Sequence, residues 1–538
     1  MATIASGPGN QAPPLEGYDL YGENRPLVEA VAREGAGWAD EALRGLGELL
    51  GGEPLEWGRL ANEHPPQLRT HDRFGNRIDE VEFHPAWHRL LGLGVEHALH
   101  AAPWREPRAG VHVARAAGFL TLAQVEAGVG CPLSMTFASL ATLREEPALY
   151  DEWMPRFTST SYDPGLRPAQ EKAGALCGMA LTERQGGSDV RANETVARPA
   201  GDGEATLRGD KWFCSAPMCD AFLVTAQAPG GLTCYFVPRV LPDGERNAFH
   251  IDRLKDKLGD RSNASSEIRL DGAWARRVGE EGRGVRTIIE MVAHTRLDCV
   301  LGSTGLMRRA VAEATHHAAH RFAFGRVLTE QPLMQNVLAD LCLDSEAATV
   351  LALRLARAYD EEDAPFRRLA TAVAKYWVCK STPPLVAEAL ECLGGNGYVE
   401  ESVLPRLHRQ SPLNSVWEGA GNVNALDVLR AVARQPESLD ALLAEIDLAA
   451  GADARLDAAV ADLRRELADP ADAELRARRL VERLALCLQG SLLVRHGDPA
   501  VADAFCASRL GGDGRRAYGT LPAGLPLAAI VERHRPRI

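Results

Sequence analysis

A block of short β-type segments interrupts an otherwise helical chain, and this change limits the folds open to its 538 residues. Between about Ala175 and Val278, β-branched and aromatic segments alternate with turns such as Gly201-Asp202-Gly203. Strands at this spacing predict a small antiparallel barrel or sandwich. The predicted strands are residues 176–181, 205–207, 211–215, 221–227, 232–238, 249–253 and 266–270.

Apolar residues recur at helical spacing on both sides of this block. After it, long helices are expected at about 285–321, 331–360, 365–392 and 423–433, and Arg434-Gln435-Pro436 breaks the pattern. The sequence therefore predicts an α+β, mainly helical protein with four regions. They are residues 1–174 (an N-terminal arm and helical domain), 175–283 (β-barrel), 284–435 (helical bundle) and 436–538 (an extra helical module).

The charge distribution and the cysteines indicate which functions and cellular locations are compatible with the sequence. The net charge of −13 argues against a surface that coats nucleic acid everywhere. Residues 471–538 hold eleven Arg against seven Asp and Glu, a local +4 that leaves −17 on the remainder. Eleven cysteines without a Cys-x-x-Cys pair predict reduced thiols. With no apolar run of bilayer length and no signal-peptide pattern, a cytoplasmic protein is expected.

One carboxylate has surroundings typical of a general base. Glu418 lies between Trp417 and a Gly-x-Gly turn, directly before a helix expected to start near Val423. Apolar surroundings raise the pKa of a Glu toward the working pH, which suits proton abstraction. The alternative is that Glu418 caps the following helix or pairs with an Arg, because acidic residues favour helix N-termini.

Two other stretches are suited to a flat or anionic ligand. Residues 181–189 (LTERQGGSD) combine glycines with hydroxyls, which exposes backbone N–H groups. Alone, this stretch is equally a strand-ending turn. Residues 211–215 (KWFCS) place an aromatic ring and a hydroxyl beside a flat cofactor, or else form a core strand.

Together these stretches resemble the acyl-CoA dehydrogenase family. The five motifs in the family's order are Thr-Glu-x-x-Gly-x-Ser-Asp (182–189), Gly-x-Lys-Trp (209–212), Arg-x-x-Phe-Gly (321–325), Gly-Gly-x-Gly-Tyr (394–398) and Glu418-Gly419. Residues 185–190, 255–259, 261–265 and 417–422, with the module after Pro436, are most similar to its adaptive-response, AidB-like branch. The resemblance implies the family's helical domain, β-barrel domain and helical bundle, plus the extra module.

The resemblance also implies FAD and a role for each matching residue. Glu418 would be the catalytic base. Arg321 and the Gly394–Gly397 loop would hold the ADP half of FAD in a neighbouring subunit, so a homotetramer is expected. Phe213, where most members have Trp, would lie with Ser215 against the flavin ring. The implied FAD contacts are Thr182, Gly187, Ser188, Phe213, Cys214, Ser215, Arg321, Phe324, Gly394, Gly395, Gly397, Trp417, Gly419 and Asn422.

Three departures from the family pattern bear on the active site. Ala420 stands where the wider family has Thr, and Glu391 stands where it has Gln. Arg184-Gln185 replaces a pair that commonly contains Pro. These changes leave open the reduction potential of the flavin and the fit of a thioester substrate. They do not argue against flavin binding.

The implied activity is α,β-dehydrogenation of a short or branched acyl-CoA by a protein of the alkylation-response type. An alternative is a stress-response flavoprotein that binds DNA and has little acyl-CoA turnover, and a third is an oxygen-using oxidase. The expected DNA contacts are to phosphates of double-stranded DNA without base readout. The residues proposed for them are Arg476, Arg479 and Arg483 near one helical face, with Arg478 beside them, and Arg515, Arg516, Arg533, Arg535 and Arg537 in a flexible tail. The alternative to DNA binding is that these arginines simply form a solvated surface.

One histidine cluster is not expected to bind a metal. His316 and His320 share a helical face beside His317, but no Cys or second ligand pair completes a site. A solvated or ion-paired face is expected instead.

Overall fold

The computed structural model describes residues 10–512, 521 and 524–536. They divide into two compact units, each assembled from segments far apart in the chain. The first unit comprises Met1–Glu53, Arg108–Val125 and Cys299–Ile538, and the second comprises Pro54–Pro107 and Glu126–Asp298. We call them the helical unit and the β unit. Helix α9 (Gly284–His320) contributes its residues up to Asp298 to the β unit and the rest to the helical unit.

The β unit is built on a seven-stranded sheet with the order β3-β6-β4-β5-β9-β7, and β8 pairs with β9. Because β6 also pairs with β7, the sheet closes on itself, which confirms the predicted small barrel. Most of its pairs are antiparallel, but β3–β6 and β4–β6 are parallel. The strands are β3 (Cys177–Ala180), β4 (Val196–Gly201), β5 (Glu204–Ser215), β6 (Ala221–Ala228), β7 (Gly231–Pro238), β8 (Phe249–Leu254) and β9 (Ser265–Val278).

Two predictions for this unit were wrong. Residues 205–207 and 211–215 form one strand, β5, because Gly209 (φ 152°) keeps the chain extended where a turn was expected. A Cβ at Gly209 would lie 2.6 Å from the Thr195 Cα, so the glycine serves a close backbone approach. The hairpin of β1 (Gln67–His71) and β2 (Arg77–Glu82) appears in a region predicted to be helical. Its strands are mainly polar and, apart from Asp79, exposed or partly exposed, so they lack the apolar alternation of a core strand.

Helices of the β unit pack against its barrel and against each other. Helix α7 (Gly130–Leu143) contacts β3, where the Cys177 N–H donates to the Thr136 Oγ1 at 3.0 Å. The other helices are α3 (Pro54–Glu63), α4 (Pro85–Glu96), α5 (Ala102–Arg105) and α8 (Pro147–Phe157). The segment between α8 and β3 contains one short 3-10 turn, Ala169–Glu171.

The four long helices that the sequence predicts are present, with bounds within two residues of the expected ones, and the helical unit holds three of them and the second part of α9. They are α9, α10 (Pro332–Asp360), α11 (Ala364–Cys392) and α14 (Gly421–Arg434). Helix α6 (Val111–Ala123) packs on α10 and α2 (Asp40–Leu50), and α1 (Arg25–Val31) packs on both α6 and α10. Long amphipathic segments were predicted accurately because their periodicity persists over many turns.

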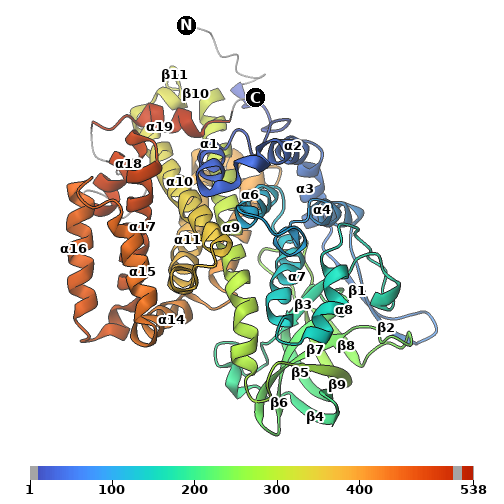
Figure 1. The fold of residues 1–538 in the computed structure, drawn as a ribbon. Coiled ribbons are helices and arrows are strands. Elements are labelled where there is room, and N and C mark those ends of the chain that lie inside the picture. Colours follow the sequence, from blue (N-terminus) through green and yellow to red (C-terminus); the bar gives the residue numbers. More distant parts are fainter. Residues whose placement is uncertain (1–9, 513–520, 522–523, 537–538) are drawn as a thin grey trace. The chain divides into compact units, whose positions relative to one another are not determined.

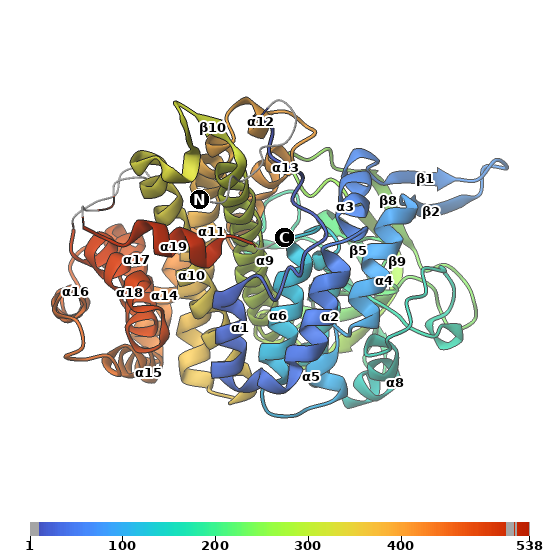
Figure 2. The same cartoon turned by 90° about the horizontal axis from the view of Figure 1, so that it is seen from above.

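The C-terminal module belongs to the helical unit and packs closely on its bundle. Helix α17 (Ala473–His496) contacts α10, α11 and α14, and Figures 1 and 2 show α15 to α18 grouped beside these helices. The Trp377 Nε1 donates to the Gln489 Oε1 at 3.0 Å, which joins α11 to α17. The remaining helices of the module are α15 (Pro436–Asp447), α16 (Ala454–Ala468), α18 (Pro499–Phe505) and α19 (Leu527–His534).

Helix α19 corrects the expectation of a flexible arginine-rich tail. Arg533 lies in this helix and pairs with Glu346 at 3.0 Å and with Glu29. The buried His534 Nε2 lies 2.8 Å from the Glu346 Oε2, and Arg308 donates to the His534 carbonyl. Apolar burial of one side of α19 and this ion cluster fix the segment, which sequence periodicity over so short a helix does not reveal. Arg515, Arg516 and Arg537 lie outside the described residues.

We expect acid to release α19 before the rest of the helical unit opens. Burial alone would raise the pKa of the Glu346 carboxyl, but hydrogen bonds and charges from His534 and Arg533 lower it. Its folded-state pKa is therefore below the unfolded value of about 4.3, so its contribution is present above that pH and is lost as pH falls through the folded pKa. Burial lowers the pKa of His534, so protonation of this ring also opposes docking.

Amide hydrogen exchange at pH 7 and at about pH 3.5 measures this release. Protection of α19 should fall more than protection of α6, which serves as the internal reference. Glu346→Gln should loosen α19 already at pH 7. Equal loss of protection in both helices would contradict the assignment.

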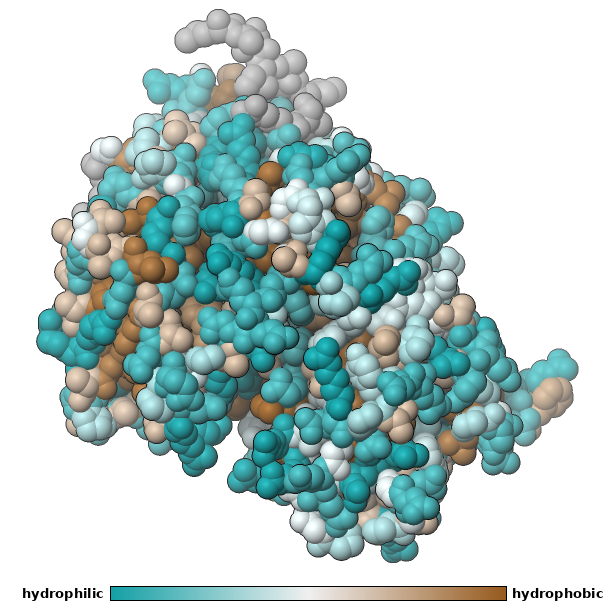
Figure 3. Space-filling model, in the orientation of Figure 1, coloured by the Kyte–Doolittle hydropathy of each residue, from teal (hydrophilic) through white to brown (hydrophobic). Residues whose placement is uncertain are grey.

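None of the described helices is suited to crossing a membrane. Among residues 10–512, 521 and 524–536, no helix combines the length and apolar character needed to cross one. Figure 3 shows a face covered mostly by hydrophilic residues, with hydrophobic ones in small separate groups. All eleven cysteines are buried as free thiols.

Candidate functional site

Glu418 lies in a strained turn at the start of α14. We call residues 414–420 the Glu418 loop. Glu418 has a φ of 56° and Gly419 a φ of 95°, so two successive residues are left-handed. A left-handed conformation is unusual for a residue with a long side chain and is often found at functional sites. Helix α14 starts at Gly421, two residues before the expected Val423.

A buried lysine holds the Glu418 loop from α11. Lys375 is 1% exposed, and its Nζ donates to the carbonyls of Trp417 at 2.7 Å and Gly419 at 2.5 Å. These two carbonyls belong to the residues on either side of Glu418. The Asn424 side chain from α14 also donates to the Gly419 carbonyl.

The tryptophan of the loop is fixed by a second chain of hydrogen bonds. The Trp417 Nε1 donates to the Asn414 Oδ1 at 2.8 Å. The Asn414 Nδ2 donates in turn to the Ser303 Oγ of α9 at 3.1 Å. Three helices therefore fix the backbone beside Glu418, which is itself partly buried. The raised pKa expected for this carboxyl stays a prediction.

Asn422 contacts the C-terminal module. Its Oδ1 accepts a hydrogen bond of 2.8 Å from the Arg478 Nε of α17. The sequence placed Arg478 near a DNA-contacting face, and nothing in its local pattern indicated a partner 56 residues away. This contact joins the module to the residue directly after the start of α14.

In the β unit, the glycine-rich stretch after β3 is tightly folded. The Trp212 N–H donates to the Thr182 carbonyl at 2.8 Å, which attaches the stretch to β5. A Cβ at Gly187 would lie 2.4 Å from the Thr182 Oγ1, so only glycine lets the chain pass this hydroxyl. Ser188 is exposed beside it. The turn therefore presents hydroxyls and backbone to solvent, as a ligand-binding turn requires.

A buried ion pair holds this turn in place. The Lys211 Nζ lies 2.6 Å from the Glu183 Oε1, and both side chains are almost fully buried. The carboxylate also accepts from the N–H groups of Glu194 and Thr195, and Lys211 donates to the Thr225 carbonyl. Burial lowers the pKa of Lys211 to about 8. Burial alone would raise the pKa of Glu183, but the ammonium and these donors lower it.

The end of β5 divides its side chains between two faces. Phe213 is half exposed and Ser215 is partly buried, and the two share one face because strand side chains alternate. The Lys255 Nζ lies 4.6 Å from the Phe213 ring centroid. Cys214 is fully buried on the opposite face, where burial raises the pKa of its thiol to about 12. A contact of Cys214 with a ligand on the exposed face would therefore use its backbone.

Arg321 and the glycine loop are joined by the N-terminal arm. The Arg321 guanidinium donates to the Asn10 carbonyl at 2.6 Å, and the Asn10 amide exchanges two hydrogen bonds with the Phe322 backbone. The Asn396 Nδ2 donates to the Gln11 Oε1 at 2.8 Å. The arm thus contacts both segments, which lie far apart in sequence.

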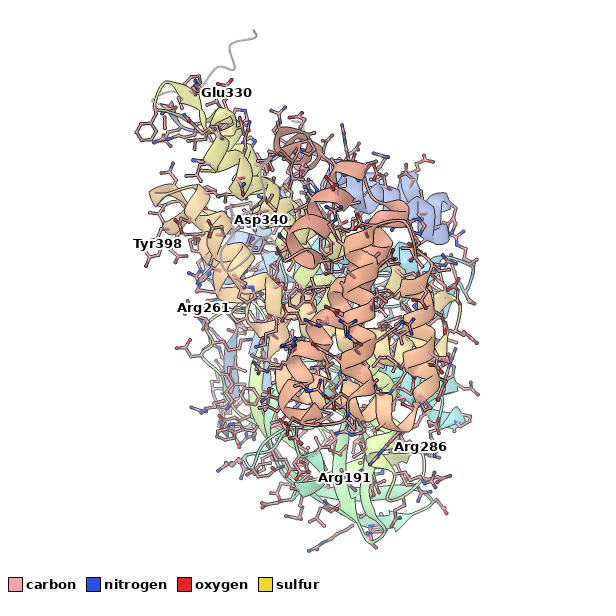
Figure 4. The ribbon with its side chains drawn as sticks, turned by 90° about the vertical axis from the view of Figure 1, so that its left-hand side faces the viewer. Arg191, Arg261, Arg286, Glu330, Asp340 and Tyr398 are labelled. Carbon is pink, nitrogen blue, oxygen red and sulfur yellow. The ribbon has the colours of Figure 1, made fainter. Side chains whose placement is uncertain are left out.

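The surface near this cluster is apolar and exposed. Phe324 lies at the turn between β10 (Phe322–Ala323) and β11 (Arg326–Val327), with 98% of its surface exposed. Tyr398 ends α12 (Gly395–Tyr398), is 80% exposed, and is directed outward in Figure 4. A Cβ at Gly397 would lie 2.2 Å from the Leu390 carbonyl oxygen, and Gly394 has a φ of 61°. These glycines allow the loop its tight path after α11.

The arginines proposed for DNA are engaged within the module. Arg479 and Arg483 both pair with Glu466, at 2.6 Å and 2.8 Å. Arg476 donates to backbone carbonyls between Glu466 and Ala471. Arg509 forms a buried pair with Asp340 and Asp344 of α10, so it supports the fold.

The histidine cluster is buried, so the expected solvated or ion-paired face is wrong. His316 and His317 are 3% and 6% exposed, and burial lowers the pKa of both. The His316 Nε2 lies 2.8 Å from the Pro13 carbonyl. In the described part of the chain, no group of three or more His, Cys, Asp or Glu is placed to hold a metal.

Three family models match successive parts of the chain. The N-terminal domain of the adaptive response protein AidB matches residues 10–164. The middle domain of acyl-CoA dehydrogenases matches residues 178–273, and their C-terminal domain matches residues 282–433.

Individual proteins extend this similarity. The AidB protein of Escherichia coli (strain K12) is 47% identical over 504 residues, which cover 92% of this chain and 93% of that protein. A solved structure of Caenorhabditis elegans ACDH-11 in complex with C11-CoA has a TM-score of 0.85 at 25% identity and covers 99% of this chain and 94% of that one. Butyryl-CoA dehydrogenase from Megasphaera elsdenii has a TM-score of 0.58 at 20% identity, covers 77% of this chain and 98% of that one, and shows the same fold.

Proposed function

Because this chain belongs to the acyl-CoA dehydrogenase family and shares the AidB N-terminal domain, we propose that it is an FAD-dependent α,β-dehydrogenase of acyl-CoA thioesters. The observation that carries the proposal is the Glu418 loop. Lys375 and Asn424 fix the backbone carbonyls beside Glu418, and Asn414 fixes the neighbouring Trp417 ring. A carboxylate on a backbone held in this way is suited to act repeatedly on one carbon atom.

The residues of the β unit fit an FAD ring system. The half-exposed aromatic ring of Phe213 shares a strand face with the Ser215 hydroxyl. The Thr182–Ser188 turn, folded against the glycine at 187, presents N–H groups and hydroxyls of the kind that bind polar and anionic ligand atoms. Bound FAD would accept the hydride that leaves the substrate β-carbon.

Glu418 has the central role in the proposed mechanism. Its carboxylate removes the proton from the α-carbon, which is weakly acidic and therefore needs a well-positioned base. Trp417 and Lys375 fix the peptide on either side, so the carboxylate need not be reoriented in each turnover. The C11-CoA complex of the Caenorhabditis elegans relative supports acyl-CoA as the ligand class, and a short or branched acyl group is the proposed substrate.

The direct test is an anaerobic titration of the purified holoprotein with a panel of acyl-CoAs. Bleaching of the flavin absorbance by a short or branched member supports the proposal. No bleaching by any member would reject it and favour a flavoprotein without acyl-CoA turnover. Rapid reoxidation of the reduced flavin in air would place the protein among oxidases.

We expect Arg321→Ala to lose flavin and weaken assembly together. The proposed arrangement is a homotetramer in which Arg321 and the Gly394–Gly397 loop hold the ADP half of a neighbouring subunit's FAD, and Arg321 suits a pyrophosphate because its guanidinium is always charged. The exposed aromatic side chains of Phe324, on the hairpin after Arg321, and Tyr398, in the glycine-loop segment, support a surface that is covered in the assembly.

Flavin absorbance and light scattering on the same sample measure both effects. Arg326→Ala, on the same hairpin, is the matched control and should change neither. A monomeric variant that keeps full flavin occupancy would contradict the shared site.

A second candidate function is non-sequence-specific binding of double-stranded DNA through the C-terminal module. The local excess of arginine favours it, although Arg509 and Arg533 are already neutralised by carboxylates. A triple variant tests this second function. Replacing Arg476, Arg479 and Arg483 by Gln in the full chain should make the affinity for DNA less sensitive to salt concentration. The slope of log affinity against log salt should become shallower by about 0.9 for each phosphate that is no longer neutralised. A control in which Arg59, Arg105 and Arg208 are replaced removes the same charge elsewhere. An equal change in both triple variants would indicate net charge alone.

A further inference from the structure

Lys375 is a buried charge with an unusual set of partners. Its ammonium contacts two backbone carbonyls, and among the residues that the structure describes no carboxylate forms an ion pair with it. By contrast, the buried Lys172 and Lys211 each pair with a carboxylate. Burying an ammonium without a counter-charge opposes folding, and an apolar side chain of similar length would avoid this. Lys375 therefore needs an explanation other than stability.

The two carbonyls explain the shape of the Glu418 loop. They belong to Trp417 and Gly419, which flank Glu418, and both point at one nitrogen atom. A sharp turn of the backbone between two carbonyls separated by one residue lets both of them reach the same atom. The left-handed φ of Glu418 (56°) and of Gly419 (95°) provides that turn. The buried charge and the backbone strain are therefore two parts of a single feature.

The chemistry of lysine suits this position better than that of arginine. The chain has six Lys beside 54 Arg, and position 375 is one of the six. An ammonium directs three donors from one atom, whereas a guanidinium spreads its donors over a planar fork. Two carbonyls that converge on one position can therefore both accept hydrogen bonds from a single ammonium nitrogen.

We propose that Lys375 is a positioning residue that holds the left-handed turn at Glu418 and so directs the Glu418 carboxylate toward the substrate α-carbon. This inference rests on the proposed function, because it assigns Lys375 a role in the same reaction. The two hydrogen bonds from Lys375 to the loop go to backbone carbonyls and not to the Glu418 carboxylate. Loss of its ammonium lets the strained turn relax and moves the Glu418 side chain, and a displacement of about 1 Å can cost about 100-fold in rate.

The test is rapid-reaction flavin reduction by acyl-CoA in the Lys375→Met holoprotein. The limiting reduction rate should fall about 10-fold to 100-fold, while FAD content and the apparent dissociation constant of acyl-CoA stay within about twofold. Lys375→Gln keeps an uncharged donor group on a shorter side chain, so its reduction rate should fall between those of wild type and Lys375→Met. In a Glu418→Gln background, Lys375→Met should cause little further loss, because the group that it positions is already absent.

A second readout keeps the inference separate from the proposed function. Amide exchange of residues 417–421 in the Lys375→Met holoprotein should accelerate, with helix α6 unchanged. If wild type is not reduced by any acyl-CoA, the dehydrogenase proposal fails, and this exchange alone decides whether Lys375 holds the turn. An unchanged reduction rate in an active protein, or unchanged exchange, overturns the positioning role. A general loss of FAD and protection in both variants would show a structural role only and would also overturn it.

Discussion

Glu418→Gln should abolish most acyl-CoA-dependent flavin reduction while the fold and the bound FAD remain. The exchange keeps the shape of the side chain and removes its basicity, and general-base catalysis contributes about 10²–10⁴-fold. The loop should keep its conformation, because Lys375 and Asn424 bind backbone carbonyls and not the carboxylate. Anaerobic stopped-flow reduction by isovaleryl-CoA, with flavin content measured on the same sample, gives the rate.

The matched control for this prediction is Glu437→Gln, which removes one exposed carboxylate from the first turn of α15. It should reduce at the wild-type rate. Undiminished reduction in Glu418→Gln would show that another group is the base, or that the measured activity is not α,β-dehydrogenation. A loss of FAD in that variant would instead assign Glu418 to cofactor binding.

Lys211→Met should destabilise the β unit by about 3–5 kcal/mol, because it leaves the buried Glu183 carboxylate without its ammonium. The turn that carries Thr182 and Ser188 should lose its support, since Glu183 also binds the N–H groups of Glu194 and Thr195. FAD occupancy is therefore expected to fall together with stability.

Hydrogen exchange of the β6 and β7 amides under increasing urea measures the effect within this unit, where a whole-chain transition would combine both units. The double variant Glu183→Gln/Lys211→Met should recover much of the loss, because a buried pair replaced at both positions is often nearly neutral. An equal or larger loss in the double variant would show that packing, and not the uncompensated charge, sets the cost.

The sequence predicted elements whose signal is periodic and missed contacts that depend on three-dimensional proximity. Helices α10 and α11 were located to within one residue by their long amphipathic patterns. Gly209-Asp210 has the composition of a turn, and only the packing of Gly209 against Thr195 shows why β5 continues through it. The polar hairpin β1–β2 buries little surface, so hydrophobic periodicity does not reveal it.

The candidate site shows the same division. Glu418 was proposed as the base from its motif, but its left-handed conformation and its support from Lys375 were not predicted. Lys375 lies in an apolar helical segment, and a single charged residue there was the available signal. The tail arginine Arg533 was misplaced because its partners, Glu29 and Glu346, are 504 and 187 residues away. Charge counting along a sequence does not identify such pairs.

The bond between Arg478 and Asn422 has a thermodynamic consequence for this family member. A ligand of the Glu418 loop that takes Asn422 as its own partner would release Arg478 from α14. Breaking the Arg478–Asn422 bond costs free energy, and a macromolecule that binds Arg478 would break the same bond. Each binding event would then make the other more favourable, so the macromolecule would change the affinity of the Glu418 loop for its ligand by some factor. Reciprocity requires the ligand to change the affinity of that macromolecule by the same factor. The C-terminal module and the Glu418 loop would thus be coupled through one hydrogen bond.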